Sequence, residues 1–334
     1  MILKLKKGLI GIEKQQKNKM KFIKPKIIIS KCLEFEACRY DGQIINNQYI
    51  EKLKKFIDFN PICPEVEIGM GIPRDTIRII ENKEKRMLYQ PETNKDYSNN
   101  MDLFSKNYLK KIEDIDGFIL KANSPSCGVN SAKIYPKKND VPPYKRGNGF
   151  FANHIVSMFP NHPIEEEKRL NNSILREHFY TAIFTLADFK TVSNFNTLYK
   201  YHAKHKYLFM AHNQTLMRKM GNIAANKNNE TIEKIKKKYY NSLLLLLSKK
   251  ARYPSNINTQ MHVMGYFKKL ISAKEKKHFL ETLGLYRNKR TPASAVNSIL
   301  YSWIFRFENE YLMKQSFFNP FPYELIQKQE SRFD

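Results

Sequence analysis

The stretch "KIIISKCLEFEACRYDG" (residues 26–42) decides how the first half of the chain folds. Three consecutive isoleucines, Ile27 to Ile29, form a β-branched run that is typical of a strand buried on both faces. The run passes directly into a loop that carries two cysteines and ends in Asp-Gly, a pair that favours a turn. A strand followed at once by a cysteine predicts that this thiol lies at the edge of a sheet.

Helical and strand patterns alternate after this stretch. The segments "NNQYIEKLKKFIDF" (46–59) and "MDLFSKNYLKKIED" (101–114) carry apolar residues at helical spacing. The segment "DGFILKAN" (116–123) predicts another strand, and weaker strand signals lie in the polar region 75–100. This alternation predicts an α/β domain with a Rossmann-like, mostly parallel sheet, whose ligands bind at the carboxyl ends of the strands.

Three of the four cysteines follow apolar segments of this predicted domain. Cys32 follows the run 26–30, Cys127 follows the strand 116–123, and Cys63 lies in a short apolar piece after the first helix. Since the carboxyl ends of parallel strands share one edge of the sheet, we expect these three thiols to converge there.

The pattern changes after "KKNDVPPYKRGNG" (137–149), which is rich in Pro, Gly and Lys. Long helical stretches follow and predict an all-α C-terminal helical domain; they cover about 165–190, 195–225, 230–251, 259–287 and 292–315. We therefore expect four parts: a basic N-terminal arm (1–24), the α/β domain (25–145), a linker (146–164) and the helical domain (165–330).

Composition places the chain among folded, basic proteins. It has 334 residues, 42% of them hydrophobic, and a net charge of +26 divided between both halves. Such a charge attracts polyanions such as RNA or DNA, although abundant lysines on solvated helix faces give the same balance. No apolar run is long enough for a signal peptide or a membrane span, and the irregular cysteines do not suggest disulfides. We therefore expect a cytoplasmic protein that does not enter a membrane.

The spacing of Cys32, Cys38, Cys63 and Cys127 leaves three interpretations open: a metal or cluster site, isolated buried thiols, or a redox pair. The chain has no CxxC pair, so a zinc ribbon is a poor fit, and a ferredoxin-type cysteine run is also absent.

Ordered motifs around these cysteines resemble a known family. The blocks "SKCLEFEACRYDG", "CPEVEIGMGIPR" and "ILKANSPSCG" are similar to the three signature blocks of the thiouracil desulfidase family (TudS-like, domain of unknown function 523). The C-terminal segments "LREHFYTAIF", "YKYHAKHKYLFMAHN" and "MHVMGYFKKLISAKEK" resemble the YbgA-like family, domain of unknown function 1722. Together these similarities cover about residues 25–328.

The first resemblance implies a [4Fe-4S] cluster held by three thiolates, those of Cys32, Cys63 and Cys127, with the fourth iron open. In that family the open iron takes the sulfur of a thiocarbonyl such as thiouracil or a thionucleoside, and the C–S bond is hydrolysed without net redox change, releasing sulfide. The family does not require a thiol at the position of Cys38, so we leave Cys38 out of the site. Its alternatives are a small core residue, a fourth ligand or a redox partner.

The same motifs indicate the catalytic residues. Glu65, two residues after Cys63, is the candidate general base or proton shuttle, although it could instead cap a helix or pair with Arg74. Ser124 and Ser126 are candidates for binding the substrate or donating a proton, against the alternative that they only shape a turn. Segments such as "LEFEACRYDG" depart from the commoner family pattern, which leaves open a thiolated nucleotide or tRNA base as substrate.

Two rival functions remain at this level. The first is a basic RNA- or DNA-binding protein, acting for example in tRNA thio-base processing, whose cluster is structural or sensory. The second is a zinc-stabilised interaction protein. His202, His205 and His212 share a face of a predicted helix, where packing is a more common role than metal ligation. The YbgA-like resemblance supplies no activity, and the oligomeric state stays open.

Overall fold

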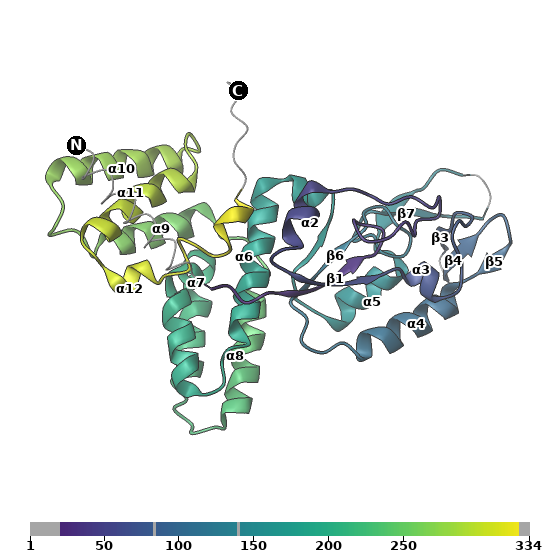
Figure 1. The fold of residues 1–334 in the computed structure, drawn as a ribbon, viewed down its shortest axis with the longest axis horizontal. Coiled ribbons are helices and arrows are strands. Elements are labelled where there is room, and N and C mark those ends of the chain that lie inside the picture. Colours follow the sequence, from purple (N-terminus) through teal and green to yellow (C-terminus); the bar gives the residue numbers. More distant parts are fainter. Residues whose placement is uncertain (1–20, 83–84, 139–140, 327–334) are drawn as a thin grey trace, which may run out of the picture.

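The fold is taken from a computed structural model that describes residues 21–82, 85–138 and 141–326. Most of the basic arm expected at 1–24 lies outside the described residues. Figure 1 shows strands and short helices on one side of the molecule and long helices on the other, with α6 (Ser173–Phe189) between them. The expected α/β domain followed by a helical domain is confirmed.

A four-stranded parallel sheet is the centre of the N-terminal part. Its strand order is β2-β1-β6-β9, formed by β2 (Asp58–Ile62), β1 (Lys26–Ser30), β6 (Gly117–Leu120) and β9 (Ile164–Glu166). In register, Ile28 of the central strand β1 stands between Asn60 of β2 and Phe118 of β6. Pro61 is tolerated because β2 is an edge strand, where a residue without an N–H breaks no ladder.

The isoleucines of β1 explain why the sheet is buried on both faces. Ile27 and Ile29 pack into one hydrophobic cluster with α2 (Gln48–Leu53) and α6, whereas Ile28 packs into a second cluster on the opposite face. That second face is covered by α4 (Ser98–Lys110) and α5 (Phe150–Met158), which lie against each other. Because successive side chains of a strand point to opposite faces, this apolar strand contributes core contacts on both faces of the sheet.

A second, mixed sheet and a short helix complete this part. The sheet has the order β5-β4-β3-β7-β8, in which only β3 and β7 pair in parallel. Its strands are β3 (Arg78–Glu81), β4 (Arg86–Gln90), β5 (Lys95–Asp96), β7 (Ala132–Tyr135) and β8 (Lys145–Gly147). The helix α3 (Pro64–Glu67) follows β2 directly, with Cys63 at its N-cap position.

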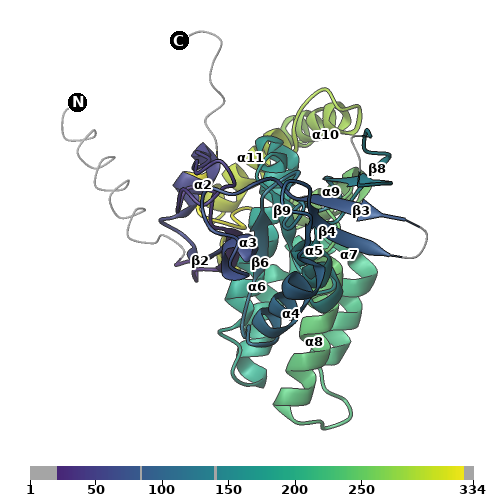
Figure 2. The ribbon, with the colours of Figure 1, turned by 90° about the vertical axis from the view of Figure 1, so that its right-hand side faces the viewer.

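The C-terminal part consists of helices around a third hydrophobic cluster. They are α7 (Phe195–Ala224), α8 (Ile232–Leu247), α9 (Tyr253–Met264), α10 (Ala273–Arg287), α11 (Ala293–Arg306) and α12 (Glu310–Met313). Helices α7 and α8 run side by side in both views (Figures 1 and 2). Helix α6 is apolar on nearly all sides because Tyr180 and Ile183 pack on the sheet while Leu186 and Phe189 pack on the helices.

Three predicted helices are wrong in extent, and the one expected over 292–315 is divided into α11 and α12. The helix expected over 46–59 ends at Leu53, and Asp58 already belongs to β2. The single helix expected over 259–287 is two helices, because Ser272 starts α10 with a capping box in which its hydroxyl accepts from Glu275 N and Glu275 accepts from Ser272 N. Apolar spacing alone does not show where one helix stops and the next begins.

The domain boundaries stay a prediction. Within the segment expected as a linker, 146–164, the chain forms α5 and the first residue of β9. Short 3-10 turns lie at Arg169–Asn171 and Tyr323–Leu325.

Candidate active site

Three thiols meet where β1, β2 and β6 end. Cys32 lies two residues after β1, Cys63 directly follows β2, and Cys127 lies in the loop after β6. These three strands are neighbours and parallel, so their carboxyl ends share one edge of the sheet. All three side chains are buried and line a single cavity of about 730 Å³. The structure thus brings together the three cysteines that the sequence singled out.

Cys38 is a fourth thiol in the same place. It is fully buried and borders the cavity, and the sulfur of Cys63 lies 3.8 Å from its carbonyl oxygen. The neighbouring thiol of Cys32, together with burial, raises the pKa of Cys38 to about 11. Sequence reasoning left Cys38 out because the family motif does not require it; the available signal was a second cysteine within the same loop.

The surroundings of Cys63 and Cys127 favour the protonated thiol. The pKa of Cys63 is raised by its contact with Cys38 and by burial, and burial raises the pKa of Cys127. The hydroxyls of Ser30 and Ser124 act in the opposite direction on Cys127 by hydrogen bonding to its sulfur. Buried thiols of this kind become thiolates when a cation binds and compensates the lost hydration, which is the condition for a thiolate metal centre.

Glu65 lies beside the thiols and is held by two partners. Arg74 donates to its Oε2 from Nε at 2.9 Å and from Nη2 at 2.6 Å, and Ser126 Oγ donates to its Oε1 at 2.9 Å. The same guanidinium donates from Nη1 to the carbonyl of Cys38 at 3.1 Å and approaches the sulfur of Cys63 at 3.9 Å. Glu65 therefore pairs with Arg74, one of the alternatives from the sequence, and lines the cavity at the same time.

The two candidate serines differ in position. Ser124 lines the cavity, and its hydroxyl oxygen accepts from the backbone N–H groups of Ser126 at 3.2 Å and Cys127 at 3.1 Å. Ser126 is fully buried, and its hydroxyl is used for the hydrogen bond to Glu65. Ser124 is thus placed to contact a ligand, while Ser126 orients the carboxylate.

The turn that carries Cys127 is fixed by a segment expected to be a linker. Gly149 packs against this turn so closely that a Cβ there would collide with the carbonyl of Ser126. Directly after it, Phe150 N donates to Pro125 O at 2.9 Å and Ala152 N donates to Ser126 O at 3.0 Å. The start of α5 therefore provides hydrogen-bond donors for the carbonyl groups of the turn. The residues "KRGNG" do not predict this role from the sequence.

Acidic side chains near β9 hold the neighbouring backbone. Glu167 accepts from Ala122 N at 2.6 Å and from Lys121 Nζ at 2.8 Å, while Glu166 accepts from Val129 N at 2.7 Å. Sequence analysis missed both glutamates, since a strand of three residues carries no periodic signal.

Positive charge dominates the wall of the cavity. Its charged lining residues are one acid, Glu65, and eight bases, namely Lys31, Arg39, Arg74, Arg78, Lys121, Lys133, Arg146 and Lys168. Several bases have carboxylate partners, as in the pair of Lys31 with Glu36. Among the described residues, no ion pair is found for Lys133, Arg146 or Lys168. Arg146 donates instead to Asn123 Oδ1 at 2.9 Å and to Ser131 O at 3.0 Å.

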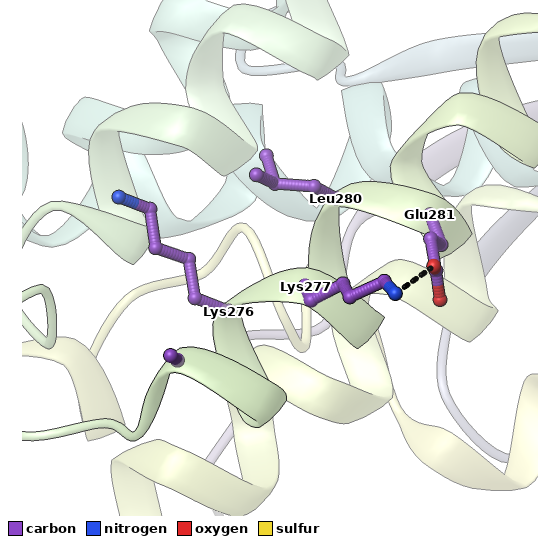
Figure 3. A pocket seen from close by; sticks show the side chains of 5 residues that line it. Lys276, Lys277, Leu280 and Glu281 are labelled. Atoms are coloured by element: carbon purple, nitrogen blue, oxygen red, sulfur yellow. Dashed lines mark ion pairs between the residues drawn. The ribbon is translucent and has the colours of Figure 1, made fainter.

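A second cavity, of about 440 Å³, lies against α10 and does not have this character. It is lined by Ala273, Leu280, Lys276, Lys277 and Glu281, and Figure 3 shows the ion pair of Lys277 Nζ with Glu281 Oε1 at 3.9 Å. Those five residues supply no thiol, so we place the candidate site at the edge of the parallel sheet.

The histidines of α7 point to separate partners. His205 contacts Asp188 Oδ2 and Ser316 Oγ, each at 2.7 Å, and His202 contacts Tyr239 OH at 2.8 Å. His212 contacts the carbonyl of Lys249 at 2.9 Å. Within the part of the chain that the structure describes, no three His, Cys, Asp or Glu side chains are grouped to hold a metal ion.

The basic run on α8 does not offer its aromatics to a nucleic acid. Tyr239 is fully buried and stacks on Phe189 with ring centroids 5.5 Å apart, and Tyr240 also stacks on Phe189, at 5.6 Å. The lysines of this run, residues 234–240, precede the two tyrosines, and Lys234, Lys237 and Lys238 are exposed. This agrees with the alternative that the positive charge belongs to solvated helix faces. In the described ranges no helix has the length and apolar character of a membrane span.

Comparisons with known proteins match two separate segments of the chain. A family model described as 2-thiouracil desulfurase matches residues 27–167, and one described as protein of unknown function DUF1722 matches residues 206–322. The uncharacterized protein YbgA of Escherichia coli (strain K12) is 27% identical over 126 residues, which are 37% of this chain and 75% of YbgA. A solved structure described as a [4Fe-4S]-dependent thiouracil desulfidase, TudS, is 27% identical and covers 44% of this chain and 94% of its own, with a TM-score of 0.37. The chain therefore joins a TudS-like desulfurase domain to a YbgA-like domain.

Proposed function

We propose that the N-terminal part removes sulfur from a thiolated pyrimidine, with Cys32, Cys63 and Cys127 as the ligands of a [4Fe-4S] cluster. The observation that carries this proposal is the meeting of the three thiols at one cavity, within the segment that matches the desulfurase family. Soft thiolates are the ligands that iron–sulfur clusters take in proteins. A cluster is wider than a single ion, so its ligands stand farther apart than those of a mononuclear site.

The donor set fits this cofactor. The three sulfurs come from the ends of three neighbouring strands and line one cavity. Arg74 and Lys121 border the same cavity and offset the negative charge that three thiolates would concentrate there. When bound, the cluster would supply a Lewis-acidic iron that polarises the thiocarbonyl sulfur.

The residues of the chain would carry the proton transfers. Hydrolysis exchanges the C=S group for C=O, consumes one water and releases hydrogen sulfide without an oxidant or reductant. Glu65 takes the proton of the attacking water, while Arg74 and Ser126 hold the carboxylate in one orientation. Ser124, with its hydroxyl at the cavity, donates a hydrogen bond to the substrate.

The basic wall favours an anionic form of the substrate. Lys133, Arg146 and Lys168 are cations at the cavity for which no carboxylate partner is found within the described residues. A free thiolated base is neutral and gains little from these charges, whereas a phosphate group on the substrate would be attracted by them. We therefore expect a thionucleotide to be a better substrate than the free base.

The test is sulfide release by the full chain after anaerobic reconstitution with iron and sulfide. The substrates are 2-thiouracil, 4-thiouracil, the 5′-monophosphate of 4-thiouridine, and thiolated tRNA, with the cluster-free chain as control. Sulfide release from the monophosphate, faster than from the free bases, is the expected result. Absence of sulfide release from all four substrates by a chain that holds its cluster would contradict the desulfurase assignment.

A further inference from the structure

Tyr40 is an aromatic side chain at the cavity that the proposed chemistry does not use. It lines the cavity together with the three cysteines, and 43% of its surface is exposed. Within the described part of the chain, no other aromatic ring is found packed on it. An exposed ring that borders a cavity and has no packing partner is available to a ligand.

A tight turn fixes the backbone of Tyr40. Gly42 N donates to Arg39 O at 3.0 Å, which makes Tyr40 and Asp41 the two central residues of a β-turn. The φ of Gly42 is +68°, a conformation that a residue with a Cβ rarely adopts. Gln43 N also donates to Asp41 Oδ1, at 3.1 Å. The tyrosine side chain therefore projects from a backbone that is held in one conformation.

This turn is tied to the residues of the proposed chemistry through Arg74. Its backbone N–H donates to Tyr40 O at 2.8 Å. Its guanidinium donates to Cys38 O at 3.1 Å and to Glu65 Oε2 at 2.6 Å. One arginine thus joins the turn of Tyr40 to the carboxylate beside the thiols.

Arg39 supports the ring of Tyr40 itself. Its guanidinium carbon lies 5.4 Å from the centroid of that ring, and its Nη2 pairs with Asp41 Oδ2 at 3.2 Å. A cation against an aromatic ring favours one orientation of the ring, and a tyrosine has only two χ angles to fix. The ring is therefore largely preorganised before a ligand binds.

We propose that the pyrimidine ring of the substrate stacks on Tyr40 while its phosphate contacts Lys133 and Arg146. These two bases also line the cavity and stand opposite each other in the register of β7 and β8. The inference rests on the proposed function in taking a thiolated pyrimidine nucleotide as the ligand. Because stacking uses the face of a base, Tyr40 holds the thiolated substrate and its oxygen-containing product alike.

The experiment measures the equilibrium binding of uridine 5′-monophosphate (UMP) and of ribose 5-phosphate to the reconstituted full chain by calorimetry. Ribose 5-phosphate carries the phosphate but no base. Tyr40→Ala should raise the Kd for UMP by about 5- to 100-fold, the range expected for loss of one base stacked on an aromatic ring, and leave binding of ribose 5-phosphate unchanged. Tyr40→Phe keeps the ring and should bind UMP as the wild type does.

Tyr253→Ala is the matched control. Tyr253 is also 43% exposed and has Lys289 Nζ 6.0 Å from its ring centroid, but it lies in α9 and does not line this cavity. This variant should keep the wild-type affinity for UMP. No binding of UMP by the wild type, equal affinity of the wild type and Tyr40→Ala, or equal weakening of both ligands would each overturn the proposal. None of these readouts uses sulfide release, so the desulfurase assignment can fail separately.

Discussion

The two parts of the chain bury polar side chains in different ways. In the N-terminal part, Cys32 and Cys63 are buried and Glu65 is half-buried, and all three border a cavity. In the helical part, His205 is buried between Asp188 and Ser316, in the order of a hydrolase triad, yet Ser316 is 2% exposed and lines neither of the two cavities described above. A buried reactive group indicates a catalytic role when it borders a cavity, and a structural role when its polar atoms are bonded to neighbouring side chains.

The largest effect expected from this comparison is the loss of the cofactor. Cys63→Ala removes one of the three proposed ligands, so the reconstituted chain should lose its iron and all sulfide release. Iron content and visible absorption measure the outcome.

The matched control is His205→Asn in the helical part, which removes a buried side chain whose two ring nitrogens contact Asp188 and Ser316. This variant should lower the melting temperature and keep the iron. Full iron retention by Cys63→Ala would contradict the placement of the site.

Acidification should weaken the helical part. Burial lowers the pKa of His178 and His202 to about 4, below the ordinary value of 6.5, so the folded state holds both rings neutral. The unfolded chain binds more protons between pH 6.5 and 4, and stability is therefore lost as the pH falls through that window, by about 3 kcal/mol for each group. Melting temperature against pH for the wild type and His178→Asn measures this: the variant should show the shallower dependence.

The sheet supplies an opposing contribution in the same window. Burial raises the pKa of Asp116, which lies at the start of β6, to about 6. This carboxyl binds a proton in the folded state before it does so in the unfolded chain, so its contribution becomes more favourable as the pH falls below 6. Asp116→Asn removes this contribution to stability. If the melting temperatures of Asp116→Asn and of the double variant Asp116→Asn/His178→Asn then change in parallel with pH, the histidine effect is refuted.

A smaller change tests the packing behind the cysteine turn. Gly149→Ala places a methyl group against the carbonyl of Ser126, which should cost about 1–3 kcal/mol and reduce sulfide release by moving the turn. Gly284→Ala in α10 is the control, since a Cβ there meets nothing within 4 Å and helix propensity should stabilise the fold by about 0.5–1 kcal/mol. Equal melting temperatures for the two variants would show that the turn shifts to accommodate the added methyl group without loss of stability.

The smallest effect concerns the basic wall. Lys168→Ala removes one charge at the cavity mouth, which should raise KM for a thionucleotide a few-fold, by about 0.2–1 kcal/mol, and leave the free base unaffected. The effect is measured as the KM of wild type and variant for each of the two substrates. An equal change in both KM values would show that Lys168 does not recognise the phosphate.

The sequence predicted the parts of the fold that carry strong local signals. The isoleucine run of β1, the strand 116–123 and the three cysteine blocks led to one sheet edge because parallel strands share a direction. Strand β9 and the contact of Gly149 with the cysteine turn were missed, since both depend on residues distant in sequence. Cys38 was set aside because only the folded loop shows that it lines the same cavity as Cys32 and Cys63.

The most direct test of the site is the iron and acid-labile sulfide content of the anaerobically purified full chain, read with its visible spectrum. The arrangement of Cys32, Cys63 and Cys127 predicts a brown protein with a broad visible band and about four irons and four sulfides per chain. A colourless chain that binds no iron on reconstitution, or that binds zinc in its place, would contradict the account.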